Sequence, residues 1–342
     1  MDDARTELDA AITLVDSPVA RIRLGGLLRL ARLADDVPRL RQGVVTVLGA
    51  YLRRPVPAGT GREARSERDV RRAVLGLLRD RLQDPAAATT WCGLDVDLRD
   101  GVLEGDLSGV VVTAGLRLDR AVVPQGATLD LSGARVRAGA LVLDRLTLDG
   151  RLDATGLVVE SGQASFDRMR LADGAQALLD DARVDGGCLL VRGVDVGAGL
   201  LALRRLHVTA GLVSLHETHV AGGTLALDGL GVDGGGVSLG TTTVETGTLD
   251  LTAARVGGGL LTLGLTGVRG GRVSLADAEV GDGGTVRLDG LHVDDATDVA
   301  WGPFAAARGA DLPTPDLPTP DLPTPDAAGR QDVPSPPERA AS

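Results

Sequence analysis

The fold is decided by residues 196–243, which read VGAGLLALRRLH, VTAGLVSLHETH, VAGGTLALDGLG and VDGGGVSLGTTT. Each twelve-residue unit begins with valine, has a glycine three positions later, and mostly carries apolar residues at offsets five and seven. The spacing continues without interruption from Val184 to Val280, and looser units extend it back to Val102 and forward to Val293. A fixed period of this kind is typical of stacked repeat architectures.

Apolar residues two positions apart mark short β-strands that turn one face toward an interior. In the unit at Val220, Leu225 and Leu227 form one inward pair, and Leu230 and Val232 form the next. A single unit leaves its apolar face exposed, so neighbours must stack at about 4.8 Å, as in a β-solenoid. The inward core positions that we predict are Val196, Leu201, Leu203, Leu206, Val208, Leu225, Leu227, Leu230 and Val232.

The size of one coil is less certain, because twelve residues can form a two-sided turn or half of a four-sided turn of 24 residues. At offset ten, large Leu206 and Leu230 alternate with small Thr218 and Thr242, which favours the 24-residue coil. Earlier units do not follow this alternation, so both sizes stay open. The predicted fold class is mainly β: a right-handed β-solenoid of about eight coils, with four sides and 24 residues per coil favoured over two sides.

Proline placement divides the chain into three parts. Ten of the 16 prolines follow Trp301, and Pro124 is the only one between residues 100 and 301. Because proline cannot donate to a β-ladder, the proline-poor stretch is expected to be continuous β structure. We predict an α-helical domain at 1–90, a solenoid at 91–304, and an acidic tail at 305–342 with three DLPTP repeats, extended and disordered.

The first ninety residues carry apolar positions at helical spacing. One helix is predicted after Ser17-Pro18, an N-cap and first-turn pair, and a second is predicted from Pro38 to about Tyr51. A third is predicted to begin at Ser66, where Ser66-Glu67-Arg68-Asp69 reads as an acidic variant of the capping box.

Aromatic residues are rare, with two Trp, one Tyr and two Phe in 342 residues, so the core must be aliphatic. An uncovered coil would leave apolar surface and a strand edge open to pairing with another molecule. We therefore predict that Trp91 caps the solenoid core at its start and that Trp301, with Phe304, caps it at its end.

The segments that flank and begin the repeat carry a family resemblance; they are Arg23-Leu24-Gly25-Gly26-Leu27, Val47-Leu48-Gly49-Ala50-Tyr51-Leu52, Arg68-Asp69-Val70-Arg71-Arg72, the run from Trp91 to Leu98 and the run from Asp106 to Val110. Over roughly residues 8 to 300 the chain resembles actinobacterial pentapeptide-repeat proteins with a twelve-residue F-x-G-G-T-V-x-F-x-G-A-x repeat. Leu or Val stands here at the Phe positions, and the membrane segment of many relatives is missing. The resemblance implies a right-handed quadrilateral β-helix, and most members have no assigned biochemical role.

Composition limits the classes of protein that the chain can belong to. No segment reaches the roughly 18 apolar residues of a membrane span, and the start MDDARTELDA lacks the basic and apolar stretches of a signal peptide. Two cysteines, Cys92 and Cys188, are too few for a disulfide framework and fit a reducing cytosol. We expect a soluble, cytoplasmic protein of net charge −11.

The histidines and the Gly-Gly pairs could form binding sites, but simpler structural roles explain them. His207 and His219 cluster with His216 and Glu217, but a four-sided coil places the first two on opposite faces, so surface histidines are favoured over a metal site. Gly-Gly pairs are explained by turns, because the chain has no lysine to complete a phosphate-binding loop. We expect no catalytic, cofactor-binding or metal-ligating residue.

Serines recur at outward strand positions, at Ser214, Ser238 and Ser274, and we expect no His and acid positioned to activate them. The two cysteines are expected to be packing residues or free thiols. The stretch from Arg53 to Arg81, with nine Arg against four acids, is interpreted as a solvated helix face, so direct nucleic-acid binding is not expected.

These observations predict a non-catalytic binding or scaffold protein that presents its solenoid faces to an unidentified protein partner, in an unknown oligomeric state. One alternative is a DNA mimic that modulates a topoisomerase such as DNA gyrase, as some pentapeptide-repeat proteins do. The solenoid segment has net charge −10 over 200 residues with 16 Arg interspersed, which is thin beside duplex DNA. The other alternative is an enzyme with a site at the helix-solenoid junction near Trp91.

Overall fold

The computed structural model describes residues 2–57, 59–264, 267–288, 292–293, 298–300 and 302. By their internal contacts, the described residues belong to one compact unit. The predicted cap residues Trp301 and Phe304 and the predicted tail at 305–342 lie outside the described residues.

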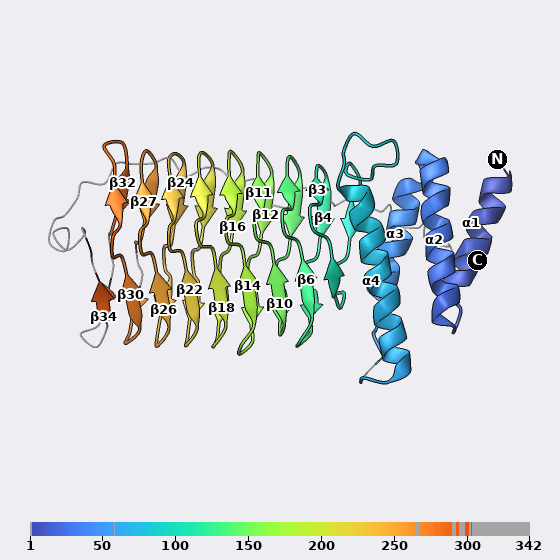
Figure 1. Cartoon of the computed structure of the whole chain (residues 1–342), viewed down its shortest axis with the longest axis horizontal. Helices are drawn as coiled ribbons and strands as arrows, with labels where there is room; N and C mark the ends of the chain where they lie inside the picture. The colour runs from blue at the N-terminus through green and yellow to red at the C-terminus, as the bar shows by residue number, and fades with distance from the viewer. Residues whose placement is uncertain are drawn as a thin grey trace, which may run out of the picture. The chain divides into compact units, whose positions relative to one another are not determined.

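Four α-helices precede the strands (Figure 1). They are α1 (Asp2–Val15), α2 (Ala20–Asp36), α3 (Arg41–Leu52) and α4 (Arg62–Leu82), with a 3₁₀ turn η1 (Pro38–Leu40) before α3. Leu27 and Leu30 of α2 are fully buried, and α4 buries Val74, Leu75 and Leu78. The described helices therefore share one aliphatic core with the first coil of the solenoid.

Two helix starts differ from the prediction. Helix α4 begins at Arg62, so Ser66 lies inside it and is no N-cap; the acidic residue that supports its first turn is Glu63. Helix α2 begins at Ala20 after Val19, while Ser17 Oγ accepts a hydrogen bond from the Val19 N–H at 3.2 Å. Ser17 therefore closes a turn before the helix instead of capping it.

The strands form four parallel sheets that the chain visits in turn. Sheet 1 contains β1 (Val96–Asp97), β4 (Gly115–Arg117), β8 (Ala140–Val142), β12 (Gln163–Ser165), β16 (Cys188–Leu190), β20 (Leu212–Ser214), β24 (Gly236–Ser238), β28 (Leu260–Thr262) and β32 (Thr285–Arg287). Sheet 2 contains β5 (Val122–Val123), β9 (Thr147–Leu148), β13 (Arg170–Leu171), β17 (Asp195–Val196), β21 (His219–Val220), β25 (Thr243–Val244), β29 (Gly267–Val268) and β33 (His292–Val293).

The other two sheets complete the coil. Sheet 3 contains β2 (Gly105–Asp106), β6 (Thr128–Asp130), β10 (Arg151–Asp153), β14 (Gln176–Leu178), β18 (Leu200–Ala202), β22 (Thr224–Ala226), β26 (Thr248–Asp250), β30 (Arg272–Ser274) and β34 (Asp298–Ala300). Sheet 4 contains β3 (Val111–Val112), β7 (Arg135–Val136), β11 (Val158–Val159), β15 (Arg183–Val184), β19 (His207–Val208), β23 (Gly231–Val232), β27 (Arg255–Val256) and β31 (Glu279–Val280).

One coil passes through all four sheets, so sheets 1 and 3 lie on opposite sides, as do sheets 2 and 4. Leu201 pairs with Leu225 in sheet 3, and Val208 pairs with Val232 in sheet 4. Both pairs are 24 residues apart, which confirms the four-sided coil of about eight turns and excludes the two-sided alternative. Figure 1 shows the coils stacked one beside the next.

The interior of the described coils is mainly aliphatic, and it also encloses Phe166. All nine predicted inward residues have no exposed surface. Thr218 and Thr242 at offset ten are also fully buried, and their hydroxyls donate to the Leu215 carbonyl at 2.9 and 3.0 Å. A small polar side chain is therefore accepted inside the coil where a backbone carbonyl satisfies its hydrogen bond.

The coil corners require glycine where backbones of neighbouring coils meet. Gly139 has φ +66°, and a Cβ at this position would lie 1.8 Å from the Ala114 carbonyl oxygen. No side chain fits in that space, so this glycine, unlike many turn glycines, is fixed by contact as well as by conformation.

Helices α3 and α4 cover the N-terminal end of the solenoid. A Cβ on Gly49 in α3 would lie 2.3 Å from the Asp97 carbonyl, and one on Gly105 in β2 would lie 3.0 Å from Leu75 Cδ1 of α4. These close approaches bring both helices onto the first coil. Trp91 is fully buried beneath α4, with the Arg81 guanidinium 4.9 Å from its ring centroid.

Candidate functional site

The outward positions of sheet 1 form a surface without charge across six successive coils. None of these positions in β8, β12, β16, β20, β24 and β28 carries an ionisable acid or base other than the Cys188 thiol. The residues of this uncharged face are Ala140, Val142, Gln163, Ser165, Cys188, Leu190, Leu212, Ser214, Gly236, Ser238, Leu260 and Thr262. Ser165, Leu190 and Ser214 are buried, and the other nine are partly exposed. It lies between Arg117 on β4 and Arg287 on β32.

Sheet 4 has a different surface, dominated by charged pairs. Its outward arginines form ion pairs with nearby acids, among them Arg183 with Asp185 at 2.6 Å and Arg255 with Glu279 at 3.2 Å. Such exposed pairs contribute little stability but remain strongly hydrated. Removing water from sheet 1 therefore has a lower electrostatic cost than removing it from sheet 4.

A polar ladder runs along the corner between sheets 1 and 2. Asp144 accepts hydrogen bonds from Ser165 Oγ at 2.5 Å and from the Asp167 N–H at 3.0 Å, while Asp167 accepts from Arg192 Nε at 2.9 Å. Burial raises the pKa of Asp144, against the opposing effect of its hydrogen bonds. The ladder fixes the border of the uncharged face across three coils.

A second ladder runs along the corner between sheets 3 and 4. Arg204 contacts Asp180 of one neighbouring coil and Asp228 of the other, both at 3.3 Å. One turn position later, Arg205 pairs with Asp181 at 2.6 Å. Arginines thus neutralise acids of adjacent coils, so acidic charge is interrupted along this corner.

One serine of the uncharged face has a histidine partner, which was not expected from the sequence, although no acid completes the pair. Ser238 Oγ lies 2.7 Å from His216 Nε2, across 22 residues of chain. The imidazole ring of His216 packs against the next coil at Gly240, which has no side chain. A Cβ added to Gly240 would lie 2.9 Å from His216 Cε1. Within the described residues, no acid is hydrogen-bonded to His216, so the pair lacks the third member of a triad.

The other singled-out histidines separate as the four-sided coil requires. His207 lies in sheet 4, 3.3 Å from Asp233, and His219 lies in sheet 2, hydrogen-bonded to Thr243 Oγ1 at 2.8 Å. No group of three or more potential metal ligands occurs within the part of the chain that the structure describes. Both cysteines are free, and burial raises the pKa of the Cys92 thiol.

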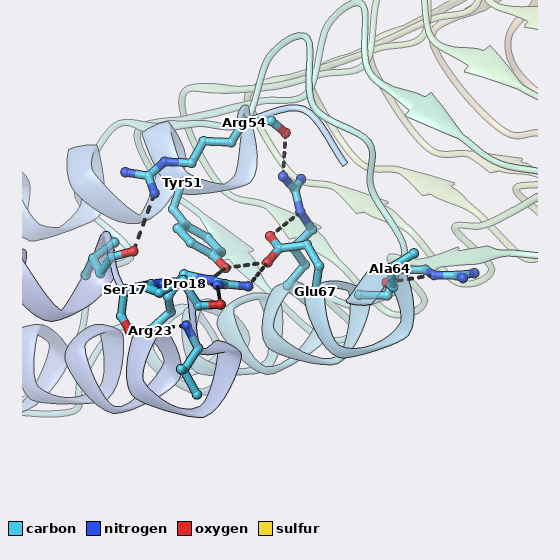
Figure 2. A network of polar contacts seen from close by, with 11 residues as sticks. Ser17, Pro18, Arg23, Tyr51, Arg54, Ala64 and Glu67 are labelled. Carbon is cyan, nitrogen blue, oxygen red and sulfur yellow. Dashed lines mark hydrogen bonds and ion pairs between the residues drawn. The ribbon is translucent and has the colours of Figure 1, made fainter. Parts of the chain in front are cut away.

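The helix-solenoid junction contains a buried charge network that the sequence analysis missed (Figure 2). Glu67 accepts from Arg23 at 2.6 Å, from Arg71 at 3.0 Å and from the Tyr51 hydroxyl at 3.0 Å. Arg71 also donates to the carbonyls of Leu52, at 2.6 Å, and Arg54. Only Glu67 was visible in the sequence, as part of a capping box, because its partners come from three separate helices.

Beside this network lies a cavity of about 280 Å³. Arg68 and Arg71 of α4, Glu104 and Val102 of the first coil, and Pro124 of the second line it. Near Trp91, by contrast, the described cavity is about 10 Å³ and has an almost wholly aliphatic lining with Cys92. Polar groups therefore converge at the junction, but on the Arg68 side and not beside Trp91.

Three comparisons with known proteins returned nothing: no family model, no curated protein and no solved structure matches the chain. Among the described residues, no helix combines the length and the apolar character needed to cross a lipid bilayer.

Proposed function

We propose that this protein is a non-catalytic scaffold that binds a partner protein through the uncharged face of sheet 1. The observation that carries the proposal is the contrast between this face and sheet 4. Six coils present side chains without a formal charge on sheet 1, whereas sheet 4 presents ion pairs such as Arg183–Asp185 and Arg255–Glu279. A broad surface with a low desolvation cost is suited to a protein interface.

The half-buried leucines of the face are its best contact points. Leu212 and Leu260 both stand at the first, outward position of their strands, with the inward Val213 and Leu261 next to them. Their side chains add apolar area on a rigid frame, because each strand is hydrogen-bonded to a neighbour on both sides. A partner gains this area without ordering a loop.

The test is capture from native cell extract by immobilised full-length protein. The variant Leu212→Arg should lose the captured partner, and the matched variant Leu200→Arg on the opposite sheet 3 should retain it, with unchanged circular dichroism in both. Equal capture by all three proteins, or loss of capture only on deleting residues 305–342, would overturn the proposal.

The topoisomerase alternative is disfavoured by the corner ladders, where Arg204 and Arg205 neutralise acids that a DNA mimic needs exposed. A supercoiling assay with DNA gyrase separates the two proposals, since inhibition at micromolar concentration supports the mimic. The enzyme alternative, a site at the helix-solenoid junction near Trp91, is disfavoured because the cavity there is about 10 Å³ and has an almost wholly aliphatic lining.

We also propose a relationship to the pentapeptide-repeat proteins, supported by the 24-residue, four-sided coil and by the twelve-residue repeat. A cytoplasmic location is proposed on the strength of two free cysteines, one of them buried.

A further inference from the structure

The junction cavity is separate from the uncharged face and has no part in the proposed scaffold function. Its lining residues come from segments that are distant in sequence. They are Val56 and Pro57 before α4, Arg68 and Arg71 within α4, Val102 and Glu104 in the first coil, and residues 124–127 in the second coil. Its volume of about 280 Å³ is close to the lower end of ligand pockets, roughly 300 Å³. The size fits a small metabolite.

Arg71 supplies buried donors to this cavity. Its side chain is only 4% exposed, and its hydrogen bonds to Glu67, Leu52 and Arg54 use the Nε–H and one N–H of each terminal nitrogen. A guanidinium has five N–H donors, so two remain without a partner among the described residues. Buried donors that lack an acceptor are costly, and a ligand oxygen would satisfy them.

Arg68 adds a second guanidinium, one turn earlier on the same helix. Its Nε and Nη2 donate only to the carbonyls of Ala64 and Gly59, both at the long distance of 3.3 Å. Within the described residues, no carboxylate lies at ion-pair distance from Arg68. Its remaining donors are therefore available to an anion.

The charge balance also favours an anion. Arg23 and Arg71 share the single carboxylate of Glu67, which leaves one positive charge in excess in this buried cluster. Glu104, the other acid that lines the cavity, is already paired with Arg72. A ligand of one negative charge would offset the excess on Arg23 and Arg71, and the unpaired Arg68 guanidinium adds a second positive charge that also favours an anion.

We propose that the cavity binds a small monocarboxylate whose oxygens accept hydrogen bonds from Arg68 and Arg71. A planar carboxylate matches the paired donors of a guanidinium better than a point charge does. Val56, Val102 and Pro124 supply aliphatic contacts for a short hydrocarbon body. The bound molecule would connect α4 to both of the first two coils, so binding raises the thermal stability of this junction.

The test is isothermal titration of the full-length protein with isovalerate, with its neutral amide isovaleramide, and with inorganic phosphate. Isovalerate should bind, and the amide and phosphate should bind at least tenfold more weakly. Equal affinity for the amide would overturn the role of the two arginines, and equal or tighter binding of phosphate would overturn the choice of a carboxylate.

Two variants and a matched control locate the site. Arg68→Gln should raise the dissociation constant for isovalerate at least tenfold, and Gln125→Trp should abolish binding by filling the exposed side of the cavity. Arg65→Gln, an exposed change on the same helix, should leave the affinity within twofold. No binding by the wild type at millimolar isovalerate, or the same loss with Arg65→Gln, would overturn the proposal; unchanged melting temperatures of the free variants confirm that each one folds.

Discussion

Leu225 lies in register beside Leu201 on neighbouring parallel strands, although 24 residues separate them in the chain. Both side chains are fully buried, so the apolar columns inside the solenoid run from coil to coil. Each coil buries its inward residues only by stacking on its neighbours, which makes stability a property of the interfaces between coils.

A charge in one of these columns should therefore be severely destabilising. Leu227→Asp places a carboxylate at a fully buried position, and we expect the free energy of unfolding to fall by more than about 4 kcal/mol. Thr224→Asp, at an outward position of the same coil, is the control and should change it by less than about 1 kcal/mol. Urea denaturation measures both, and a similar loss in the two variants would contradict the inward assignment.

The corner glycines should differ according to the space around them. Gly139 and Gly133 have nearly the same positive φ, +66° and +65°, but only Gly139 faces a backbone oxygen at 1.8 Å from an added Cβ. In both alanine variants the new residue must adopt a left-handed backbone conformation, which lowers the free energy of unfolding by about 1–2 kcal/mol. Gly139→Ala should lose about 1–3 kcal/mol more, and equal melting temperatures for the two variants would argue against close contact between the coils.

Glu67 should be the most sensitive acid of the helical part. Its side chain is 8% exposed and balances Arg23 and Arg71, so Glu67→Gln leaves the buried guanidinium of Arg71 and the partly buried one of Arg23 without a carboxylate. We expect a loss of about 3–5 kcal/mol of unfolding free energy. Glu63→Gln, exposed on the same helix, should have almost no effect; a stable Glu67→Gln variant would show that the network contributes little.

The pH dependence of stability should include a contribution from Asp97. The Arg99 guanidinium donates hydrogen bonds to this carboxylate and holds its pKa at about 2 in the folded protein, below about 3.9 in the unfolded chain. The stabilisation is thus present above about pH 4 and is lost as the pH falls through about 2. Asp97→Asn should be less stable than the wild type at neutral pH, and the difference should vanish near pH 2; a pH-independent difference would contradict the assignment.

The sequence predicts the solenoid well because its information is periodic. Inward residues recur at fixed offsets, and the twelve-residue unit matches half a coil wherever it occurs. The coil size was harder to predict, because the alternation of leucine and threonine at offset ten, which favours the 24-residue coil, is absent from the earlier units. Thr218 and Thr242 nevertheless occupy an interior column. Only the carbonyl of Leu215, which accepts from both hydroxyls, explains their presence there.

The helical part and the junction were predicted less well, for a physical reason. Helix α1 was not predicted as a separate helix. It packs closely on Gly26 of α2, where an added Cβ would lie 2.8 Å from Leu14 Cβ, and this contact cannot be recognised from local spacing. The Glu67 network and the cavity beside it likewise join residues from separate elements. No local spacing connects Arg23, Glu67 and Glu104, so only the folded chain brings them together.

The 24-residue coil is tested most directly by spin labels on paired cysteines, in a background of Cys92→Ala and Cys188→Ala. Labels at Thr224→Cys and Thr248→Cys lie on adjacent strands of sheet 3, whereas labels at Thr224→Cys and Gly236→Cys lie on opposite sheets. We predict strong dipolar broadening of the electron paramagnetic resonance spectrum for the first pair and none for the second. Strong broadening for the pair twelve residues apart would contradict the four-sided coil.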